Sequence, residues 1–439
     1  MVHQACFAGW LVAAVVAQSP AADPVFFVRG DVNQDGAEDL SDAVALLNHL
    51  FQGGAQPACR SAGDVNDDNG LDLSDAVYQL SALFLGGASI PAPYPDCGDD
   101  PTAGELDCRE FLRCEWPSVA ARYGTLVTIA GSGTLDDGVN GWEPRFEGGP
   151  ATAADLSNPH MAMADAAGNV YVADKEAHAI RKVTAKGTIH TVAGVNSPDD
   201  DGDEPGPAAE RSLYSPNGVW VRADGTFYVL DTDNGKVRRV GTDGIMTTLF
   251  SHPGEITVGR GLWVRDDERL AYFVSSTNVN VWSPEQGSRV YAAGFSSPAN
   301  LVVSPAGDLV VADRGLHQVF KVHPDGSKVA IAGNGLTSGG GDGELALETG
   351  LFGVRGVWFF PDGGYVLATH QGSQIWYVDR SARIHLFLDG ADNEHSGDGE
   401  HYQTPGKKVS ECRAVTVDTQ GNVIITESDR GYVRVVKRR

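Results

Sequence analysis

The stretch Leu301–Gly333 reads LVVSPAGDLVVADRGLHQVFKVHPDGSKVAIAG and holds four short apolar runs separated by turns that contain Gly, Asp or Pro. Short apolar runs bounded by such turn residues are typical of β-strands. Strands that follow each other through short turns usually pair as neighbours. The stretch therefore predicts one antiparallel sheet of four strands.

The same order of runs and turns recurs along the chain. The segment Ala414–Arg439 stops after its third strand, and a lone fourth strand, GTLVTIAG, lies at Gly124–Gly131, ahead of every repeat. If the lone strand completes the last sheet, the sheets form a closed ring without an open edge. The sequence therefore predicts a mostly β protein with a six-bladed β-propeller. The other complete copies are Met161–Gly194, Val219–Phe250, Leu262–Gly294 and Val357–Leu388.

Three motifs in this region resemble NHL repeats. They are the pattern D-x-x-N-x-x-V at Asp231–Val237, its relative at Asp313–Val319, and the run Gly148–Pro159. The resemblance covers residues 125–439 and implies an NHL-like propeller closed by the strand 125–131. The same fold hosts substrate-binding domains, cell-surface domains, lyases and lactonase-like proteins, so the resemblance by itself implies no single activity.

Length and composition limit the classes of function. The chain has 439 residues, more than one compact core usually holds, so at least two folded units are expected. Glycine makes up 54 residues, which favours many turns over long helices. Acidic residues outnumber basic ones by 58 − 33 = 25. This excess disfavours nucleic-acid binding and favours cations as small partners.

A second internal repeat precedes the propeller. Gly30–Gly54 aligns with Gly63–Gly87, and each copy places oxygen-bearing side chains at alternate positions of a loop. A hard cation such as Ca²⁺ takes six to eight oxygen ligands, so two calcium ions are expected. The expected ligands are Asp31, Asn33, Asp35, Asp39, Asp42 and the carbonyl of Ala37 in the first loop, and Asp64, Asn66, Asp68, Asp72, Asp75 and the carbonyl of Gly70 in the second.

Each loop is followed by apolar residues at helical spacing. We expect one amphipathic helix after each loop, the two helices burying each other, and no helix ahead of either loop. Gly36 should supply the sharp turn of the first loop and Asn69 that of the second, because Asn adopts the left-handed region more readily than most residues. The helical residues are Ala43, Val44, Leu47, Leu50 and Phe51, then Ala76, Val77, Leu80, Leu83 and Phe84.

Loop, helix and duplication together resemble a type I dockerin over residues 30–87. The resemblance implies calcium-dependent folding and docking to a cohesin partner, often in secreted proteins that degrade polysaccharides. Leu40–Ser41 and Leu73–Ser74 occupy the positions that help dockerins select the cohesin. The expected architecture is thus a small α-helical dockerin-like module ahead of the propeller.

The N-terminus and the cysteines indicate export. Phe7–Ala17 is an apolar run too short to span a bilayer, so residues 1–22 are predicted to be a signal peptide and the protein to be secreted or on the cell surface, with no membrane span. Residues 23–115 then form the module, 116–124 a linker and 125–439 the propeller. Cys59, Cys97, Cys108 and Cys114 suit two disulfides, with all three pairings open. Cys412 should be a buried thiol, and Cys6 leaves with the signal peptide.

One end of the predicted ring gathers charged residues. Residues that enter the innermost strands and residues that end the second strands lie at the same end of a propeller. Three arginines, Arg260, Arg355 and Arg413, would converge there. They would hold an anion such as a carboxylate or a uronate, because the guanidinium fork pairs well with carboxylates. The alternative is that Asp174, Asp231, Asp313 and Glu427 neutralise those arginines or cap turns. The predicted ligand-binding residues are His160, Asn217, Arg260, Arg355 and Arg413.

The long loops 196–211, 335–350 and 391–408 share this face and either bind calcium or a partner or are solvated linkers. Hydrolase, nucleotide-binding and zinc motifs are absent from the sequence, so catalytic residues stay unassigned. We therefore expect a secreted recognition protein whose propeller binds an extracellular protein or glycan. The alternative is a propeller enzyme, a lactonase-like hydrolase or a lyase, acting in polysaccharide degradation.

Overall fold

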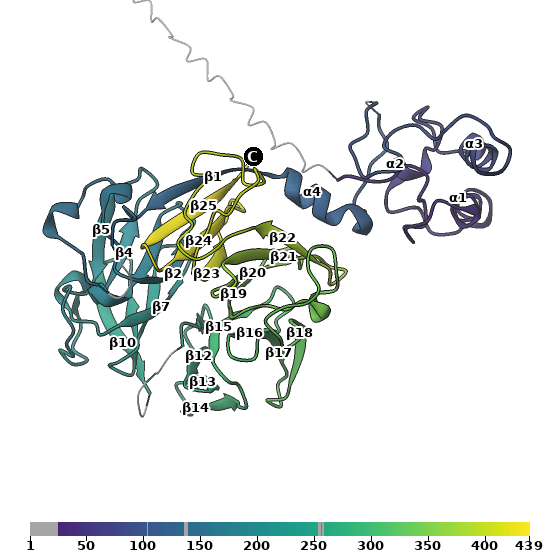
Figure 1. Cartoon of the computed structure of the whole chain (residues 1–439). Coiled ribbons are helices and arrows are strands. Elements are labelled where there is room, and N and C mark those ends of the chain that lie inside the picture. The colour runs from purple at the N-terminus through teal and green to yellow at the C-terminus, as the bar shows by residue number, and fades with distance from the viewer. Residues whose placement is uncertain (1–24, 103, 136–138, 253–255, 257–258) are drawn as a thin grey trace, which may run out of the picture. The chain divides into compact units, whose positions relative to one another are not determined.

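The structure is a computed structural model, and it describes residues 25–102, 104–135, 139–252, 256 and 259–439 (Figure 1). The predicted signal peptide and Cys6 lie outside the described residues. The chain divides into two compact units, one ending at Cys114 and the other spanning Glu115–Arg439. Each unit is described by itself.

The second unit is a six-bladed β-propeller, as predicted. Every blade is an antiparallel sheet with an inner strand at one edge, and the inner strands are β2, β7, β11, β15, β19 and β23. Blade 1 contains β2 (Pro159–Ala164), β3 (Val170–Asp174), β4 (Ala179–Val183) and β5 (Ile189–Ala193); blade 2 contains β7 (Pro216–Val221), β8 (Phe227–Asp231), β9 (Lys236–Val240) and β10 (Ile245–Ser251), with β6 (Gly206–Pro207) as a fifth strand; blade 3 contains β11 (Leu262–Val264), β12 (Ala271–Ser275), β13 (Asn278–Ser283) and β14 (Gly287–Ala292).

The remaining blades have the same layout, and short 3-10 helices lie in the connections. Blade 4 contains β15 (Pro298–Val303), β16 (Leu309–Asp313), β17 (Gln318–Val322) and β18 (Lys328–Ala332); blade 5 contains β19 (Val354–Phe359), β20 (Tyr365–Thr369), β21 (Gln374–Val378) and β22 (Ile384–Leu388); blade 6 contains β23 (Cys412–Val417), β24 (Val423–Glu427), β25 (Tyr432–Arg438) and β1 (Tyr123–Ala130). The 3-10 helices are η2 (Pro144–Phe146), η3 (Ala151–Ala153), η4 (Lys175–Ala177), η5 (Ala208–Glu210) and η6 (Ala346–Glu348).

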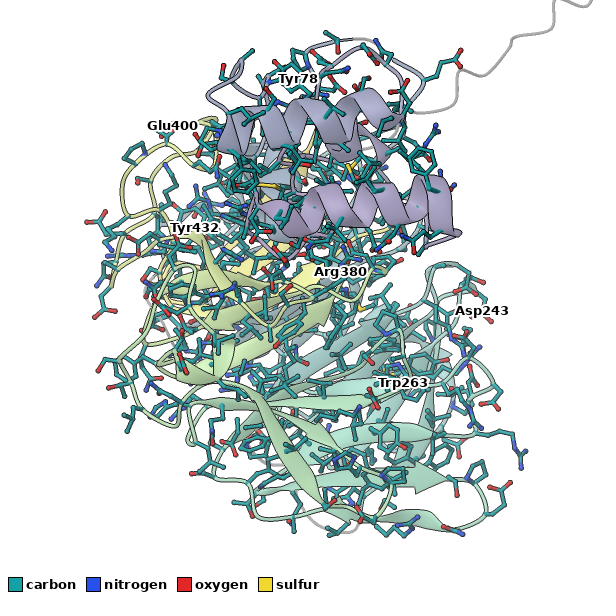
Figure 2. The ribbon with its side chains drawn as sticks, turned by 90° about the vertical axis from the view of Figure 1, so that its right-hand side faces the viewer. Tyr78, Asp243, Trp263, Arg380, Glu400 and Tyr432 are labelled. Carbon is teal, nitrogen blue, oxygen red and sulfur yellow. A yellow bond between two sulfur atoms is a disulfide. The ribbon has the colours of Figure 1, made fainter. Side chains whose placement is uncertain are left out.

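The ring is closed by strands from opposite ends of the unit. The inner strands contact one another in the order β2, β7, β11, β15, β19, β23 and back to β2. The N-terminal strand β1 pairs with the C-terminal strand β25, which confirms the predicted closure. The outer edge of β1 is covered in turn, because the N–H of Leu126 donates to the carbonyl of Glu400 at 2.9 Å and the N–H of Tyr402 to that of Gly124 at 2.8 Å (Glu400 is labelled in Figure 2). Exposed strand edges invite aggregation, so this cover protects the last blade.

Residues 116–124, expected to be a linker, instead contain most of helix α4 (Glu115–Ala121) and the start of β1. The helix packs on blade 5, where the Trp116 ring stacks on His385 with centroids 5.1 Å apart. The buried carboxylate of Glu115 accepts hydrogen bonds from the Tyr377 hydroxyl at 2.9 Å and from Nε of Arg380 at 3.0 Å (Arg380 is labelled in Figure 2). These contacts make α4 part of the propeller unit.

Buried ion pairs join the second and third strands of three blades. In blade 1 the fully buried Arg181 donates from Nε to the fully buried Asp174 at 2.9 Å. Arg238 with Asp231 in blade 2 and Arg434 with Glu427 in blade 6 repeat the pair at 3.0 and 3.7 Å. Blades 4 and 5 place Phe320 and Trp376 at the arginine position. Blade 3 places Asn280 there, so five of the six blades fill this buried position with an ion pair or an aromatic ring.

The N-terminal unit contains both predicted helices, α1 (Leu40–Gln52) and α3 (Leu73–Phe84), which contact each other. Each helix begins with a capping box, Asp39 with Asp42 and Asp72 with Asp75. Two further short helices are α2 (Arg60–Gly63) and η1 (Leu112–Cys114). The turn of α2 directly precedes the second loop, so the expectation of no helix there is wrong. None of the helices in the described part of the chain is long and apolar enough to cross a membrane.

The two helices bury only part of the predicted apolar set. Ala43 and Ala76 are buried at their contact, together with Leu46. The expectation fails for Val44, Phe51, Val77 and Phe84, which are 46–66% exposed. The reason is that a helix presents one face to its neighbour, and the apolar stripe here is wider than the contact.

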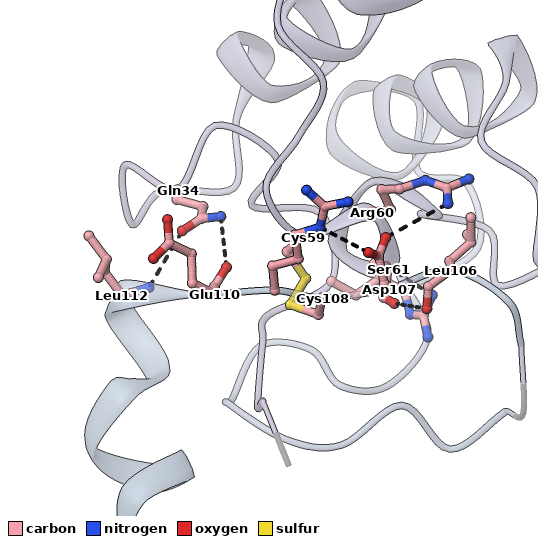
Figure 3. Close-up of a disulfide and its surroundings, with 11 residues drawn as sticks. Gln34, Cys59, Arg60, Ser61, Leu106, Asp107, Cys108, Glu110 and Leu112 are labelled. Atoms are coloured by element: carbon pink, nitrogen blue, oxygen red, sulfur yellow. Dashed lines mark hydrogen bonds and ion pairs between the residues drawn. A yellow bond between two sulfur atoms is a disulfide. The ribbon is translucent and has the colours of Figure 1, made fainter. Parts of the chain in front are cut away.

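The cysteines resolve the pairing that the sequence leaves open. Cys59 bonds to Cys108, and Cys97 bonds to Cys114. Figure 3 shows the first disulfide beside α2, where the Ser61 hydroxyl donates to the carbonyl of Leu106 at 3.2 Å. Cys412 is buried at the start of β23 and is the one free cysteine among the described residues, as expected. Burial raises the pKa of its thiol well above the ordinary value.

Replacing Arg181 with Leu should lower the free energy of unfolding of the propeller by about 3–5 kcal/mol, because Asp174 then keeps a buried charge without a partner. Chemical denaturation followed by tryptophan fluorescence measures the loss. The double variant Asp174→Thr, Arg181→Trp copies Thr369 and Trp376 of blade 5 and should recover most of it. A single variant as stable as the parent would contradict this account of the blade interior.

Candidate functional site

The five predicted residues of the channel mouth lie at one end of the ring. Four of them are the second residues of inner strands, namely His160 of β2, Asn217 of β7, Arg355 of β19 and Arg413 of β23. The fifth, Arg260, lies just ahead of β11. All inner strands start at the same end, so these residues face one another. Nδ1 of His160 lies 2.7 Å from Oδ1 of Asn217, and Nη1 of Arg413 lies 3.3 Å from Nε2 of His160. Because a guanidinium only donates, Nε2 accepts and Nδ1 carries the proton of a neutral imidazole.

Arg260 and Arg355 have no compensating partner for their inward-facing nitrogens. Their side chains are 6% and 4% exposed, and Nε of Arg260 and both Nε and Nη1 of Arg355 make no hydrogen bond among the described residues. Burial, and next the positive charges of Arg260, Arg413 and Arg314, lower the pKa of Arg355 to about 6. A guanidinium keeps its proton in proteins. The cluster therefore holds its positive charges at a cost in folding free energy.

Glu411 is the acid nearest to this cluster. Its carboxylate lies 3.2 Å from Nε2 of His370 and 3.6 Å from Nη2 of Arg413. The contact with His370, and next the charges of His370 and Arg413, lower the pKa of Glu411 to about 2, so it stays ionised. Ser428 joins them, accepting from Nε of Arg413 at 2.5 Å and donating to Glu411 at 3.2 Å. The sequence analysis missed Glu411 as a site residue, although its place directly ahead of β23 was the available signal.

The four acids weighed as partners of the channel arginines or as turn caps bond to groups of their own blades, and Asp313 caps a turn as that alternative expects. Asp174 and Asp231 pair with the third-strand arginines of their own blades. Asp313 accepts backbone N–H groups of Ser296 and Ser297 at 2.7 and 2.8 Å. Their side chains bond within their own blades and turns, whereas Glu411 lies within ion-pair distance of a mouth arginine, 3.6 Å from Nη2 of Arg413.

The fourth of those acids, Glu427, clamps a long loop. The His395 ring, on the loop 391–408, lies between two carboxylates, with Nδ1 2.9 Å from Glu427 and Nε2 3.2 Å from Asp429. Burial alone would lower the pKa of His395, but the hydrogen bonds and charges of Asp429 and Glu427 raise it to about 9. The Ser410 hydroxyl also donates to Asp429, at 2.6 Å. The protonated imidazole therefore fastens this loop to blade 6.

The other two long loops are also held by their own side chains. In the loop 196–211, Asp200 lies 2.7 Å from Nζ of Lys236 and Asp203 lies 3.1 Å from the same nitrogen. In the loop 335–350, the Asp342 carboxylate accepts the N–H of Leu386 at 2.8 Å. Throughout the described residues, no group of three or more His, Cys, Asp or Glu side chains is arranged to hold a metal ion.

The first predicted calcium loop buries two carboxylates side by side. Asp31 and Asp42 are both fully buried, and neither oxygen of Asp31 makes a hydrogen bond among the described residues. Asp42 accepts the backbone N–H of Val32 at 2.7 Å and that of Asp39 at 2.9 Å. Burial, and more weakly the charge of Asp31, raise the pKa of Asp42 to about 6. Such a pair of desolvated acids requires a compensating positive charge, and the nearest is Arg113, 3.7 Å from Asp31.

The second loop repeats the arrangement with one difference. Asp75 is fully buried with its pKa raised to about 6, chiefly by burial. Asp64, however, accepts the N–H groups of Asp68 and Asn69, both at 3.0 Å. Gly36 and Asn69 adopt left-handed conformations with φ of 88° and 64°, as predicted for the two turns. The other predicted ligands form the same contacts in both loops. The side-chain amides of Asn33 and Asn66 donate to Asp35 and Asp68, respectively. Asp39 and Asp72 cap the two helices, and Ala37 and Gly70 lie in the loops.

Comparisons with known proteins show the fold. No protein-family model and no curated protein matches the chain. Among solved structures, a protein of unknown function from Bacteroides thetaiotaomicron VPI-5482 matches 71% of this chain and 75% of its own, with 15% identity and a TM-score of 0.56. An auxiliary nutrient binding protein from Bacteroides ovatus ATCC 8483 matches 76% of this chain and 79% of its own, with 12% identity and a TM-score of 0.53. At this identity the similarity extends to the propeller fold alone.

The stability of blade 6 should depend on the charge of His395. Its folded pKa of about 9 is above the ordinary 6.5, so the stabilisation is complete below pH 6.5 and is lost as the pH rises through 9. Two and a half pKa units correspond to about 3 kcal/mol at most. Thermal unfolding of the parent and of His395→Gln between pH 6 and 10 measures this. The variant should lack this decline, and equal slopes in both proteins would contradict the clamp.

Proposed function

We propose that this chain is a secreted recognition protein whose propeller binds an anionic ligand through Arg260, Arg355 and Arg413. The observation that carries the proposal is the set of buried guanidinium nitrogens of Arg260 and Arg355 that have no hydrogen-bond partner among the described residues. Buried polar groups are almost always hydrogen-bonded, so unpaired ones at a channel mouth point to a missing ligand. The ligand is a carboxylate, carried by a uronate of a glycan or by an acidic protein segment.

A carboxylate suits this cluster in both geometry and charge. Its two oxygens accept from the fork of one guanidinium in parallel, which adds orientation to attraction. Its charge also offsets the repulsion among the arginines, to which Arg314 contributes. His160 and Asn217 would border the ligand as neutral hydrogen-bonding groups. Even with the negative charge of Glu411, the cluster keeps a net positive charge, because one carboxylate lies beside three guanidinium groups.

The N-terminal unit is proposed to be a dockerin-like module that binds two calcium ions. The buried Asp31 and Asp42 support the first site, since they lack sufficient positive charge for two buried carboxylates. Asn33, Asp35, Asp39 and the carbonyl of Ala37 would complete the oxygen set, with their counterparts serving the second site. Calcium, when bound, supplies the positive charge that these acids lack.

The module is further proposed to dock to a cohesin-like partner. Each helix exposes the same apolar positions, so the duplicated sequence repeats one surface twice. Exposed apolar groups of this kind are typical of protein interaction sites. The repeated positions are Leu40, Val44 and Phe51 on α1, and Leu73, Val77 and Phe84 on α3, with exposed fractions of 46–66%.

Neutralising Arg355 should abolish ligand binding and stabilise the empty propeller. Arg355→Gln removes a buried like charge, so the melting temperature should rise, while affinity for uronate-containing oligosaccharides should fall at least about tenfold. Calorimetric titration and thermal unfolding with and without galacturonate oligomers measure both effects. Arg289→Gln, an exposed arginine of blade 3, is the matched control. Unaltered affinity would assign Arg355 to structure, and cleavage of the oligomers would favour the enzyme alternative.

Chelation should selectively unfold the N-terminal unit. Removing calcium leaves the buried acids of both loops uncompensated, so the helical circular-dichroism signal of α1 and α3 should decrease while the tryptophan fluorescence of the propeller persists. Asp42→Asn with Asp75→Asn should weaken calcium binding at least about tenfold in calorimetric titration. Asp99→Asn, outside both loops, is the control. A helical signal indifferent to both chelator and calcium would overturn the calcium assignment.

A further inference from the structure

The end of the propeller opposite the arginines holds a cavity. It has a volume of about 420 Å³, within the usual range for small-molecule sites. Its lining comes from the far ends of the inner strands, with Trp220 near the end of β7 and Trp358 near the end of β19. Trp358 lies three positions after Arg355 on β19, which corresponds to roughly 10 Å along a strand. The cavity is therefore distinct from the arginine cluster.

Tryptophans separate the two ends of the channel. Blades 2 and 5 lie on opposite sides of a six-membered ring, yet the rings of Trp220 and Trp358 meet with centroids 5.8 Å apart. Trp263 of β11, labelled in Figure 2, packs against Trp220 with centroids 6.3 Å apart. The indoles of Trp220 and Trp358 are half-buried and face the cavity as its floor. The floor is apolar and aromatic.

The rim of the same cavity is polar. Ser304, Asp418 and Thr419 line it, and all three come from the turns that follow inner strands. Asp418 already accepts the backbone N–H groups of Gln420 and Asn422, at 2.9 and 2.8 Å, so its position is fixed by its own turn. The cavity thus combines a flat apolar floor with fixed hydrogen-bonding groups around its edge.

This combination selects a particular ligand chemistry. No Lys or Arg is among the described residues that line the cavity, so an anion finds no counter-charge there. A purely apolar ligand would make no use of the hydroxyls of Ser304 and Thr419 that line the cavity. A pyranose ring matches both the aromatic floor and the polar rim. The hydrogens of its C–H face are slightly positive and are attracted to the negative face of an indole ring. Its hydroxyls lie around the perimeter, where the rim is polar.

We propose that the cavity bordered by Trp220, Trp358, Ser304, Asp418 and Thr419 binds the neutral pyranose ring of a saccharide. The site is separate from the anion site proposed above, and it does not depend on calcium. The propeller would then recognise an anionic group at one end of its channel and a neutral sugar at the other.

Titration with neutral saccharides tests the site. Methyl β-glucopyranoside, cellobiose, xylobiose and mannobiose are added to the full chain while tryptophan fluorescence is recorded, and saturation-transfer NMR identifies the sugar protons in contact. At least one saccharide should bind saturably through its C–H face. Trp358→Leu should weaken that binding at least about tenfold, and Trp358→Phe, which keeps an aromatic face, should retain most of it.

Two further variants keep the test informative if Trp358→Leu fails to fold. Thr419→Trp, at an exposed rim position, should fill the cavity and abolish binding without altering the core. Arg355→Gln should leave saccharide binding unchanged, which separates this site from the arginine cluster. The proposal is overturned if no saccharide binds, if Thr419→Trp binds as well as the parent, or if tetramethylammonium binds in place of the sugars.

Discussion

The antiparallel pairing of β1 with β25 is the interaction on which the propeller depends. It joins residue 123 to residue 438, supplies the outermost strand of blade 6 and holds the two ends of the unit together in a ring. Ring closure fixes the inner strands against one another, and only then do their first residues meet at one end and their tryptophans at the other. Both candidate sites of the propeller are therefore products of closure rather than of any one blade.

Within the closed ring, charge is distributed unevenly. Three blades bury an acid with an arginine and so neutralise it locally, whereas the mouth buries Arg260 and Arg355 with little compensation. The N-terminal unit shows the opposite imbalance, since Asp31 and Asp42 are two buried carboxylates beside one guanidinium, that of Arg113. A chain that keeps such groups unbalanced gives up folding free energy at each place. The proposed ligands, an anion at the mouth and calcium at the loops, would supply the opposite charge at each place.

Much of this organisation follows from sequence periodicity. The repeated strands predict the blades, the orphan strand GTLVTIAG predicts closure, and strand order places His160, Asn217 and the arginines at one end. Strand order cannot tell which way an acid at that end turns, because Asp174 points to Arg181 seven residues later within its own blade. Nor does periodicity reveal that Val44 and Phe51 lie outside the helix contact, since packing geometry decides which part of a wide apolar stripe is covered.

The closing strand also sets an order for biosynthesis. Blades 1 to 5 are each built from consecutive segments, so each can form its sheet as the chain emerges during synthesis. Blade 6 cannot, because β1 must wait for β25, which ends one residue before the C-terminus. Until β25 is made, β1 is a strand without its pairing partner. The ring therefore closes only after β25 has emerged, and a chain without β25 would lack the strand that pairs with β1.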